Sequence, residues 1–97
     1  MPIGSFDFTL TVDGSGEATS PYQYTNRIHS FAIKCDTAFV WEFDIVDKDG
    51  FPVFTSDETT GPITGPRSIP VDRRCAGFFL KLKRATAGTY VVRASVD

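Results

Sequence analysis

His29 is the only histidine of the 97-residue chain, and Cys35 and Cys75 are its only cysteines. A cysteine–histidine or serine–histidine catalyst would therefore have to use His29. Cys35 follows it on the same predicted strand, which separates the two side chains by roughly 20 Å at ~3.3 Å per residue. Nothing in the sequence brings Cys75 close to His29. We therefore interpret His29 as a strand residue without a role in chemistry, and we predict no catalytic residue.

The segment Asp47-Lys48-Asp49-Gly50 begins like a calcium-binding loop. The later acidic ligands and the flanking helices of an EF-hand are missing. A tight turn between two strands explains the segment without metal, because glycine tolerates the positive φ that such turns require. No glycine-rich phosphate loop is present, since no helix follows the other glycine-containing turns. We predict neither a metal site nor a cofactor.

The element that must organise the chain is Ala38–Val46. Its large apolar residues alternate with others at a period of two, which is typical of a strand with one buried face. These residues are Phe39, Trp41, Phe43 and Ile45. The Asp47–Gly50 turn leads into Phe51–Thr55, so we predict a central hairpin against which the other strands pack.

The rest of the chain divides into shorter segments of alternating apolar and polar residues, separated by turn residues. They are Phe6–Val12, Glu17–Tyr24, Arg27–Cys35, Ile69–Asp72, Phe78–Lys83 and Thr89–Val96. In the third segment, the alternation of apolar residues shifts by one position between Ile28 and Phe31, which predicts a β-bulge near His29 and Ser30. No helical stripe of useful length is present. Seven or eight short strands predict an all-β chain, folded as a single antiparallel β-sandwich that is immunoglobulin-like or jelly-roll-like.

Three segments fall outside these strands. Met1–Ser5 is predicted to be a short N-terminal arm, which leaves residues 6–97 as the single sandwich domain. Ser56–Pro70 is rich in Thr, Gly and Pro and predicts a long ordered loop of the kind that often carries function. Arg73–Gly77 predicts a turn.

Composition narrows the classes of function. Aromatic residues at 13% and hydrophobic residues at 41% indicate an ordered globular domain. A formal charge of −2 argues against a general nucleic-acid binder. No stretch approaches the ~18 apolar residues of a membrane span, and no signal peptide pattern is visible. We expect maturation in a reducing cytoplasm, with Cys35 and Cys75 as free thiols.

The charges are segregated along the chain. Seven acids and one base lie between Asp36 and Glu58, whereas seven bases and one acid lie between Arg67 and Arg93. Acids on the central strand could face Lys81 and Lys83 across neighbouring strands as cross-strand pairs. Alternatively, acidic and basic edges of different subunits could meet head to tail. Both interpretations can hold at once.

Several segments, taken in order and spacing, together resemble one known group. They are Phe6–Thr19, Asn26–Ile33, the acidic hairpin Asp44–Gly50, Ile69–Val71, and Leu80–Lys83 with Gly88–Arg93. In this pattern the chain resembles the small all-β structural proteins of tailed bacteriophage virions. The resemblance implies a β-sandwich subunit on the head or at the head–tail region, without catalysis.

From this resemblance we expect a capsid decoration or cement protein, located in the virion after assembly in the host cytoplasm. Its expected partners are the major capsid protein or neighbouring virion proteins, and further copies of itself, with a trimer favoured. Contacts are expected from the arm, the long loop and the Arg73–Gly77 turn, without nucleic acid or membrane. The candidate interface residues are Ile3, Phe54, Ile63, Arg67, Arg73 and Arg74.

Two other classes of function stay open. A carbohydrate-binding or adhesion module would be favoured if Tyr22, Tyr24 and Phe54 formed a coplanar exposed platform. An enzyme would require His29 beside Cys75, or a pair of carboxylates in a cleft.

Overall fold

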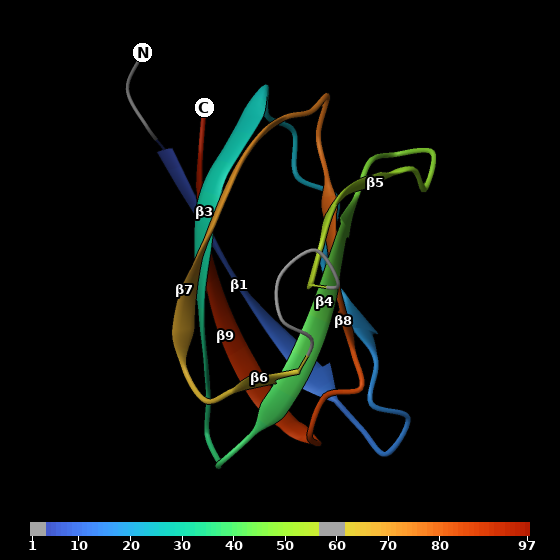
Figure 1. Ribbon diagram of the computed structural model, residues 1–97, viewed down its shortest axis with the longest axis vertical. Coiled ribbons are helices and arrows are strands. Elements are labelled where there is room, and N and C mark those ends of the chain that lie inside the picture. The colour runs from blue at the N-terminus through green and yellow to red at the C-terminus, as the bar shows by residue number, and fades with distance from the viewer. Residues whose placement is uncertain (1–3, 57–61) are drawn as a thin grey trace.

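The computed structural model describes residues 4–56 and 62–97, which form two antiparallel β-sheets packed face to face (Figure 1). The first sheet contains, in spatial order, β1 (Gly4–Val12), β9 (Gly88–Val96), β3 (Arg27–Cys35) and β7 (Arg67–Arg74). The second sheet contains β2 (Ala18–Thr19), β8 (Phe79–Lys83), β4 (Val40–Val46) and β5 (Pro52–Thr55), with β6 (Ile63–Thr64) also paired to β4. The predicted antiparallel β-sandwich is confirmed.

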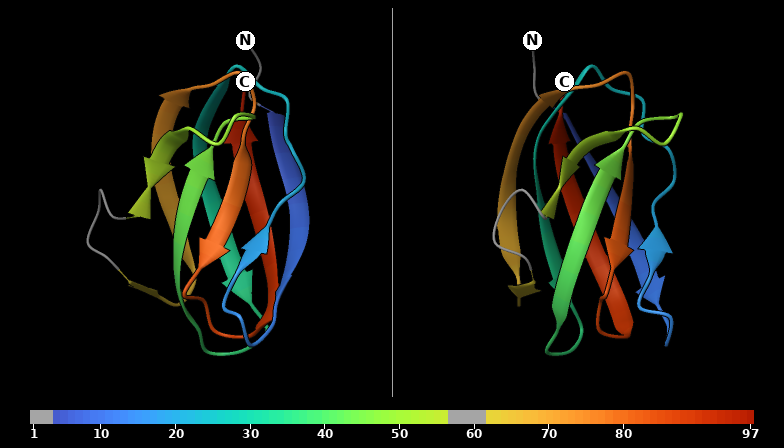
Figure 2. Two further views of the ribbon diagram at one scale, coloured as in Figure 1. Left: turned by 90° about the vertical axis from the view of Figure 1, so that its right-hand side faces the viewer. Right: turned by 45° about the vertical axis from the view of Figure 1, so that its right-hand side comes forward.

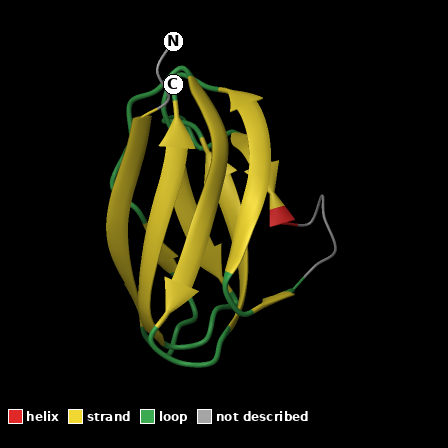
Figure 3. Cartoon of the chain, turned by 90° about the vertical axis from the view of Figure 1, so that its left-hand side faces the viewer, coloured by secondary structure: helices red, strands yellow, loops and turns green. Residues whose placement is uncertain are grey.

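Apart from one 3₁₀ residue at Ser56, the described chain consists of strands and loops (Figure 3). The described residues form no helix that could span a membrane.

The strands pair in a nested order. The first strand, β1, pairs with the last, β9, and the second strand, β2, pairs with the second-last, β8. Inside these pairs, β3 pairs with β7 and β4 pairs with β5. Successive nested pairs alternate between the two sheets. The left view of Figure 2 shows the second sheet in front of the first. This is the jelly-roll arrangement; in the constant-type immunoglobulin fold the first and last strands lie in different sheets.

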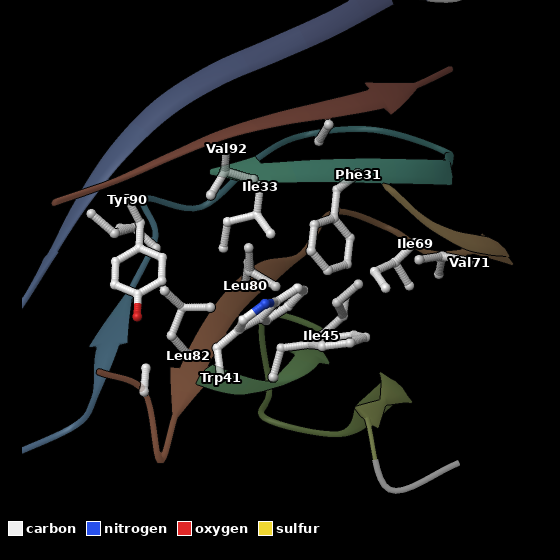
Figure 4. Close-up of a cluster of buried hydrophobic side chains, with 14 of the residues drawn as sticks. Phe31, Ile33, Trp41, Ile45, Ile69, Val71, Leu80, Leu82, Tyr90 and Val92 are labelled. Atoms are coloured by element: carbon white, nitrogen blue, oxygen red, sulfur yellow. The ribbon is translucent and has the colours of Figure 1, made fainter. Parts of the chain in front are cut away.

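The core lies between the sheets and is built by the alternation seen in the sequence. Trp41, Phe43 and Ile45 of β4 are fully buried, and Phe31 of β3 packs against the first two from the opposite sheet (Figure 4). The ring centroids of Phe31 and Phe43 are 4.9 Å apart, with the rings nearly perpendicular, a geometry that aromatic pairs favour. Tyr90 of β9 is equally buried. The predicted buried face of β4 is confirmed, but the predicted hairpin is not central: β5 is the edge strand of the second sheet, and β4 pairs with β5, β6 and β8.

The predicted hairpin turn and bulge are also confirmed. The carboxylate of Asp47 accepts hydrogen bonds of 2.9 Å from the main-chain N–H groups of Asp49 and Phe51, and Gly50 has φ +85°. The pairing of β3 with both of its neighbours shifts between Ile28 and Ser30. Such a bulge bends its strand locally, here an interior strand of the first sheet.

Several predicted boundaries are wrong. β1 begins at Gly4, so the last two residues of the predicted arm belong to a strand. The predicted loop Ser56–Pro70 contains β6 and the first half of β7, which extends over eight residues. β6 is stabilised by pairing with β4, and β7 by pairing with β3. Because these partners are distant along the chain, the local sequence pattern did not predict β6 or the first half of β7. Glu17–Tyr24 forms a regular strand only over the two residues of β2. Pro21, which lacks an N–H, interrupts the pairing, and it resumes at Gln23, which exchanges two main-chain hydrogen bonds with Phe78.

Candidate interaction surface

The outer face of the first sheet carries one in-register row of residues across all four strands. Asp7 of β1 lies opposite Arg93 of β9, Arg93 lies opposite Ala32 of β3, and Ala32 lies opposite Ser68 of β7. Ala32 and Ser68 are small, whereas Arg93 in the same row and Lys34 in the next row are long. The row is therefore hollowed at its centre.

This hollow is an open groove of ≈ 520 Å³, which we call the cationic groove. It is lined by Asp7, Ala32, Ile33, Lys34, Pro66, Arg67, Ser68, Val91 and Arg93. Val91 is an exposed apolar residue on an outer face, and it lies opposite Lys34 in the sheet. The groove thus combines an apolar floor with a charged rim, a combination typical of recognition surfaces.

The guanidinium of Arg93 is held by the carboxylate of Asp7 through two parallel hydrogen bonds. Nε donates to Oδ1 at 2.8 Å and Nη2 donates to Oδ2 at 2.9 Å. These bonds lower the pKa of Asp7 below its ordinary value and raise the pKa of Arg93 above its own. Because both side chains are exposed, the pair orients Arg93 more than it stabilises the fold.

The remaining cations of the groove are Lys34 and Arg67, and both are exposed. No ion pair joins either of them to another residue within 4–56 and 62–97. An excess of positive charge over a shallow apolar floor suits an acidic protein surface, since carboxylates pair with guanidinium groups in bidentate geometry. Arg67 was predicted from the sequence, and this groove is where the structure places it.

The other predicted interface residues lie apart from the groove. Arg73 and Arg74 end β7 and are exposed. Arg73 lies over the ring of Phe54, with its guanidinium carbon 5.0 Å from the ring centroid. Phe54 and Ile63, however, are core residues with 8% and 3% of their surface exposed, because β5 and β6 both pair with β4. Their side chains are therefore not available to a partner, and Ile3 lies outside the described residues.

Sequence reasoning missed Ala32, Lys34, Val91 and Arg93 as parts of one surface. Each points outward by simple alternation, and that signal is readable in the sequence. What could not be read is which outward positions become neighbours, since β3 and β9 are far apart along the chain.

The imidazole of His29 lies beside a carboxylate, at the bulge of β3. Its Nε2 atom is 3.2 Å from Oδ1 of Asp97, although the two are not aligned as a hydrogen bond. An open hollow of ≈ 410 Å³ lies next to Asp97 and is lined by Tyr24, Thr25, Asn26, Ala76 and Asp97, without His29. A histidine–carboxylate pair alone lacks the nucleophile that covalent catalysis needs.

The two cysteines are free and half-buried. Burial raises the pKa of the Cys75 thiol, which is opposite to the shift that creates a reactive thiolate. The thiol of Cys35 donates a hydrogen bond of 3.5 Å to Oδ1 of Asp36. Neither arrangement supports nucleophilic chemistry.

The proposed aromatic platform is not formed by the three residues expected to build it. The rings of Tyr22 and Tyr24 are nearly perpendicular, with an interplanar angle of 88°, and Phe54 is buried. Tyr22 instead packs against Phe79 of β8 with a centroid distance of 4.9 Å. Tyr24 is left 82% exposed as a single ring.

The segregated charges meet partly within the chain. Glu42 and Asp44 of β4 lie on the strand next to β8, as expected, and Lys83 donates a hydrogen bond of 3.1 Å to Asp44. Glu42 is paired with Arg84, just beyond β8, at 2.7 Å. No group of three or more potential metal ligands occurs in the described part of the chain. The head-to-tail contact between subunits stays a prediction.

Comparison with known proteins adds no relative to this picture. No protein-family model matches the chain, and no curated protein matches it at a significant level. Function must therefore be argued from the geometry of the surface and from the sequence pattern.

Proposed function

We propose that this protein is a non-enzymatic structural protein of a tailed-phage virion that decorates or cements the capsid. Its resemblance to small all-β virion proteins and its jelly-roll fold, which recurs in viral capsid proteins, both support the proposal. A fold hosts many functions, so the fold alone would not carry it. A component of the neck or head–tail region is the alternative within the same class.

The observation that carries the proposal is the cationic groove on the outer face of the first sheet. Lys34 points outward from β3, and Arg67, which lies opposite the buried Ile33, begins β7 at the rim of the groove. Both residues belong to paired strands, so the sheet sets their backbone positions. A rigid surface of this kind loses little conformational entropy when it docks on another protein. It suits a broad acidic partner better than a small substrate, because the groove is open.

The partners of this function are the major capsid protein or a neighbouring virion protein, together with further copies of this chain. Arg73 and Arg74, at the end of β7, extend the positive edge beyond the groove. In this proposal the protein assembles in the host cytoplasm and resides in the virion, and it needs no cofactor.

Co-sedimentation with capsid shells tests the proposal directly. The wild-type protein is expected to sediment with expanded shells of the matched phage and not with unexpanded ones. The double variant Lys34→Glu, Arg67→Glu is expected to lose most of this binding, and wild-type binding should weaken as salt is raised. The control is Lys81→Glu, which reverses an exposed charge on the second sheet.

Two results would contradict the proposal. Equal binding of shells by the double variant and by Lys81→Glu would show that the cationic groove does not contact the capsid. A protein that ignores both kinds of shell but binds a glycan array would favour the carbohydrate-binding alternative.

A further inference from the structure

The four edges of the two sheets differ in how they are protected against pairing with other strands. An edge strand presents unpaired N–H and C=O groups, and proteins usually guard it by shortness, proline, charge or a bulge. β2 has two residues and is followed by Pro21, and β5 has four residues and begins with Pro52. Both edges of the second sheet are therefore guarded.

β7, at one edge of the first sheet, is guarded in several ways. It contains Pro70 and ends in Arg73 and Arg74. Asp72 has the left-handed φ of +49°, where the pairing with β3 shifts. A strand that approached this edge would meet a missing N–H, an irregular backbone and repeated positive charge.

β1, at the other edge of the same sheet, has none of these devices. It runs for nine residues, pairs with β9 without a register shift, and contains no proline, lysine or arginine. Its single charge, Asp7, is already neutralised by Arg93. Among the described residues, β9 is the only strand that pairs with it.

The inner face of β1 is also incompletely covered. Leu10 and Val12 are buried, but Phe6 and Phe8, which point the same way, are only half-buried. The adjoining edge of the second sheet is β2, whose two residues are too few to cover them. An added strand beside β1 would bury these two rings further.

We propose that β1 pairs antiparallel with β1 of a second copy of this chain, across a two-fold axis at Phe8. This register matches all nine residues: Phe6 faces Leu10 of the second copy on the inner side, and Asp7 faces Thr9 on the outer side. Apolar residues then meet apolar ones, and no like charges lie opposite each other. Such self-complementarity is what a two-fold contact requires.

The contact specifies the homo-oligomer that the proposed function assumes. It closes at two copies, so it departs from the trimer that the family resemblance implies. Dimerisation is measured without capsids. Failure of shell binding and failure of dimerisation are therefore separate results, the first against the proposed function and the second against the two-fold contact.

Two variants at one exposed position test the register. Thr9→Asp places a carboxylate opposite Asp7 of the other copy on both sides of the axis, and should raise the dimer dissociation constant roughly tenfold. Thr9→Lys is the matched control and should leave the constant unchanged or lower it. Sedimentation equilibrium over a concentration series measures both, with circular dichroism to verify that each variant is folded.

Amide hydrogen exchange supplies a second measurement on the wild-type protein. Exchange in β1 should slow as the concentration rises into the dimer range, while exchange in β7 should not change. A monomer at every concentration, a three-copy species, or equal effects of the two Thr9 variants would overturn the proposal. A monomer whose β1 amides slow only on capsids would also overturn it, and would identify the added strand as a segment of a capsid protein.

Discussion

The side-chain oxygen of Ser56 accepts a hydrogen bond of 3.2 Å from the main-chain N–H of Phe43, inside the core. β5 pairs with β4 from Asp44 onward, and β6 pairs with β4 at Val40 and Trp41. The N–H of Phe43 lies between these two paired segments, so no main-chain carbonyl of β5 or β6 accepts its hydrogen bond. The side chain of Ser56 accepts it instead. Ser56, which is fully buried, thus satisfies a main-chain donor of β4 that strand pairing leaves open.

Replacing Ser56 by alanine should therefore destabilise the protein. The N–H of Phe43 would stay buried without an acceptor, at a cost of about 1–3 kcal/mol in the free energy of unfolding. Urea unfolding followed by the fluorescence of Trp41 measures the change. Ser68→Ala, at an exposed position of β7, is the control and should stay within about 0.5 kcal/mol of wild type. Equal effects of the two variants would show that the bond does not stabilise the fold.

The buried carboxylate of Glu42 depends on Arg84, whose guanidinium lies 2.7 Å away while its side chain is 68% exposed. Arg84→Ala should cost about 1–2 kcal/mol, because it leaves a desolvated charge without its partner. Adding Glu42→Gln should recover part of the loss in a double-mutant cycle. Lys81→Ala, which removes an exposed charge from β8, should have little effect. Additivity of the two substitutions would argue against the coupling.

Position 77 requires glycine for two reasons: its backbone has a positive φ, and its neighbours leave no room for a Cβ atom. Its φ is +102°, and a Cβ atom there would clash with the hydroxyl oxygen of Tyr22 and lie 2.9 Å from the carbonyl oxygen of Gln23. Gly77→Ala should destabilise the protein by about 2 kcal/mol or more, measured as a lower thermal midpoint. Gly14→Ala, where a Cβ meets nothing within 4 Å, is the control. Tyr22→Ala in the Gly77→Ala background should relieve only the side-chain clash.

Tyr90 should make stability depend on alkaline pH. Its buried hydroxyl donates a hydrogen bond of 2.6 Å to the carbonyl oxygen of Thr86. Burial, followed by the nearby charges of Cys35 and Asp36, raises its pKa from 10.0 to about 12. The unfolded chain therefore releases this proton at lower pH than the folded chain does, so the contribution is complete below pH ~10 and is lost as pH rises to ~12.

Urea unfolding at a series of pH values from 8 to ~12 measures this dependence. The free energy of unfolding should decline less steeply in Tyr90→Phe than in wild type across that window. Tyr24→Phe, which alters a largely exposed ring, should follow the wild-type curve. Identical curves for wild type and Tyr90→Phe would contradict the assignment.

Part of the candidate surface could be predicted and part could not. Arg67 was predicted as a contact residue of the Ser56–Pro70 loop; it lies in β7, on the rim of the groove. Phe54 and Ile63 were misplaced because each lies in a short segment beside a loop, where local pattern does not distinguish a core residue from an exposed one. Glu42 was expected to face outward by alternation and is nevertheless 5% exposed, since Arg84 lies against it from the end of β8.

Local alternation predicts the long strands of this protein and the face that each one buries, but it misses β6 and the first half of β7. Alternation along Trp41, Phe43 and Ile45 is a local property of extended backbone, so it survives without knowledge of neighbours. The nested jelly-roll pairing, the groove around Ala32 and the exposed edge of β1 are visible only in the folded chain. Each of these depends on which distant strands become hydrogen-bonded neighbours, and the energies that select those neighbours are spread over the whole core.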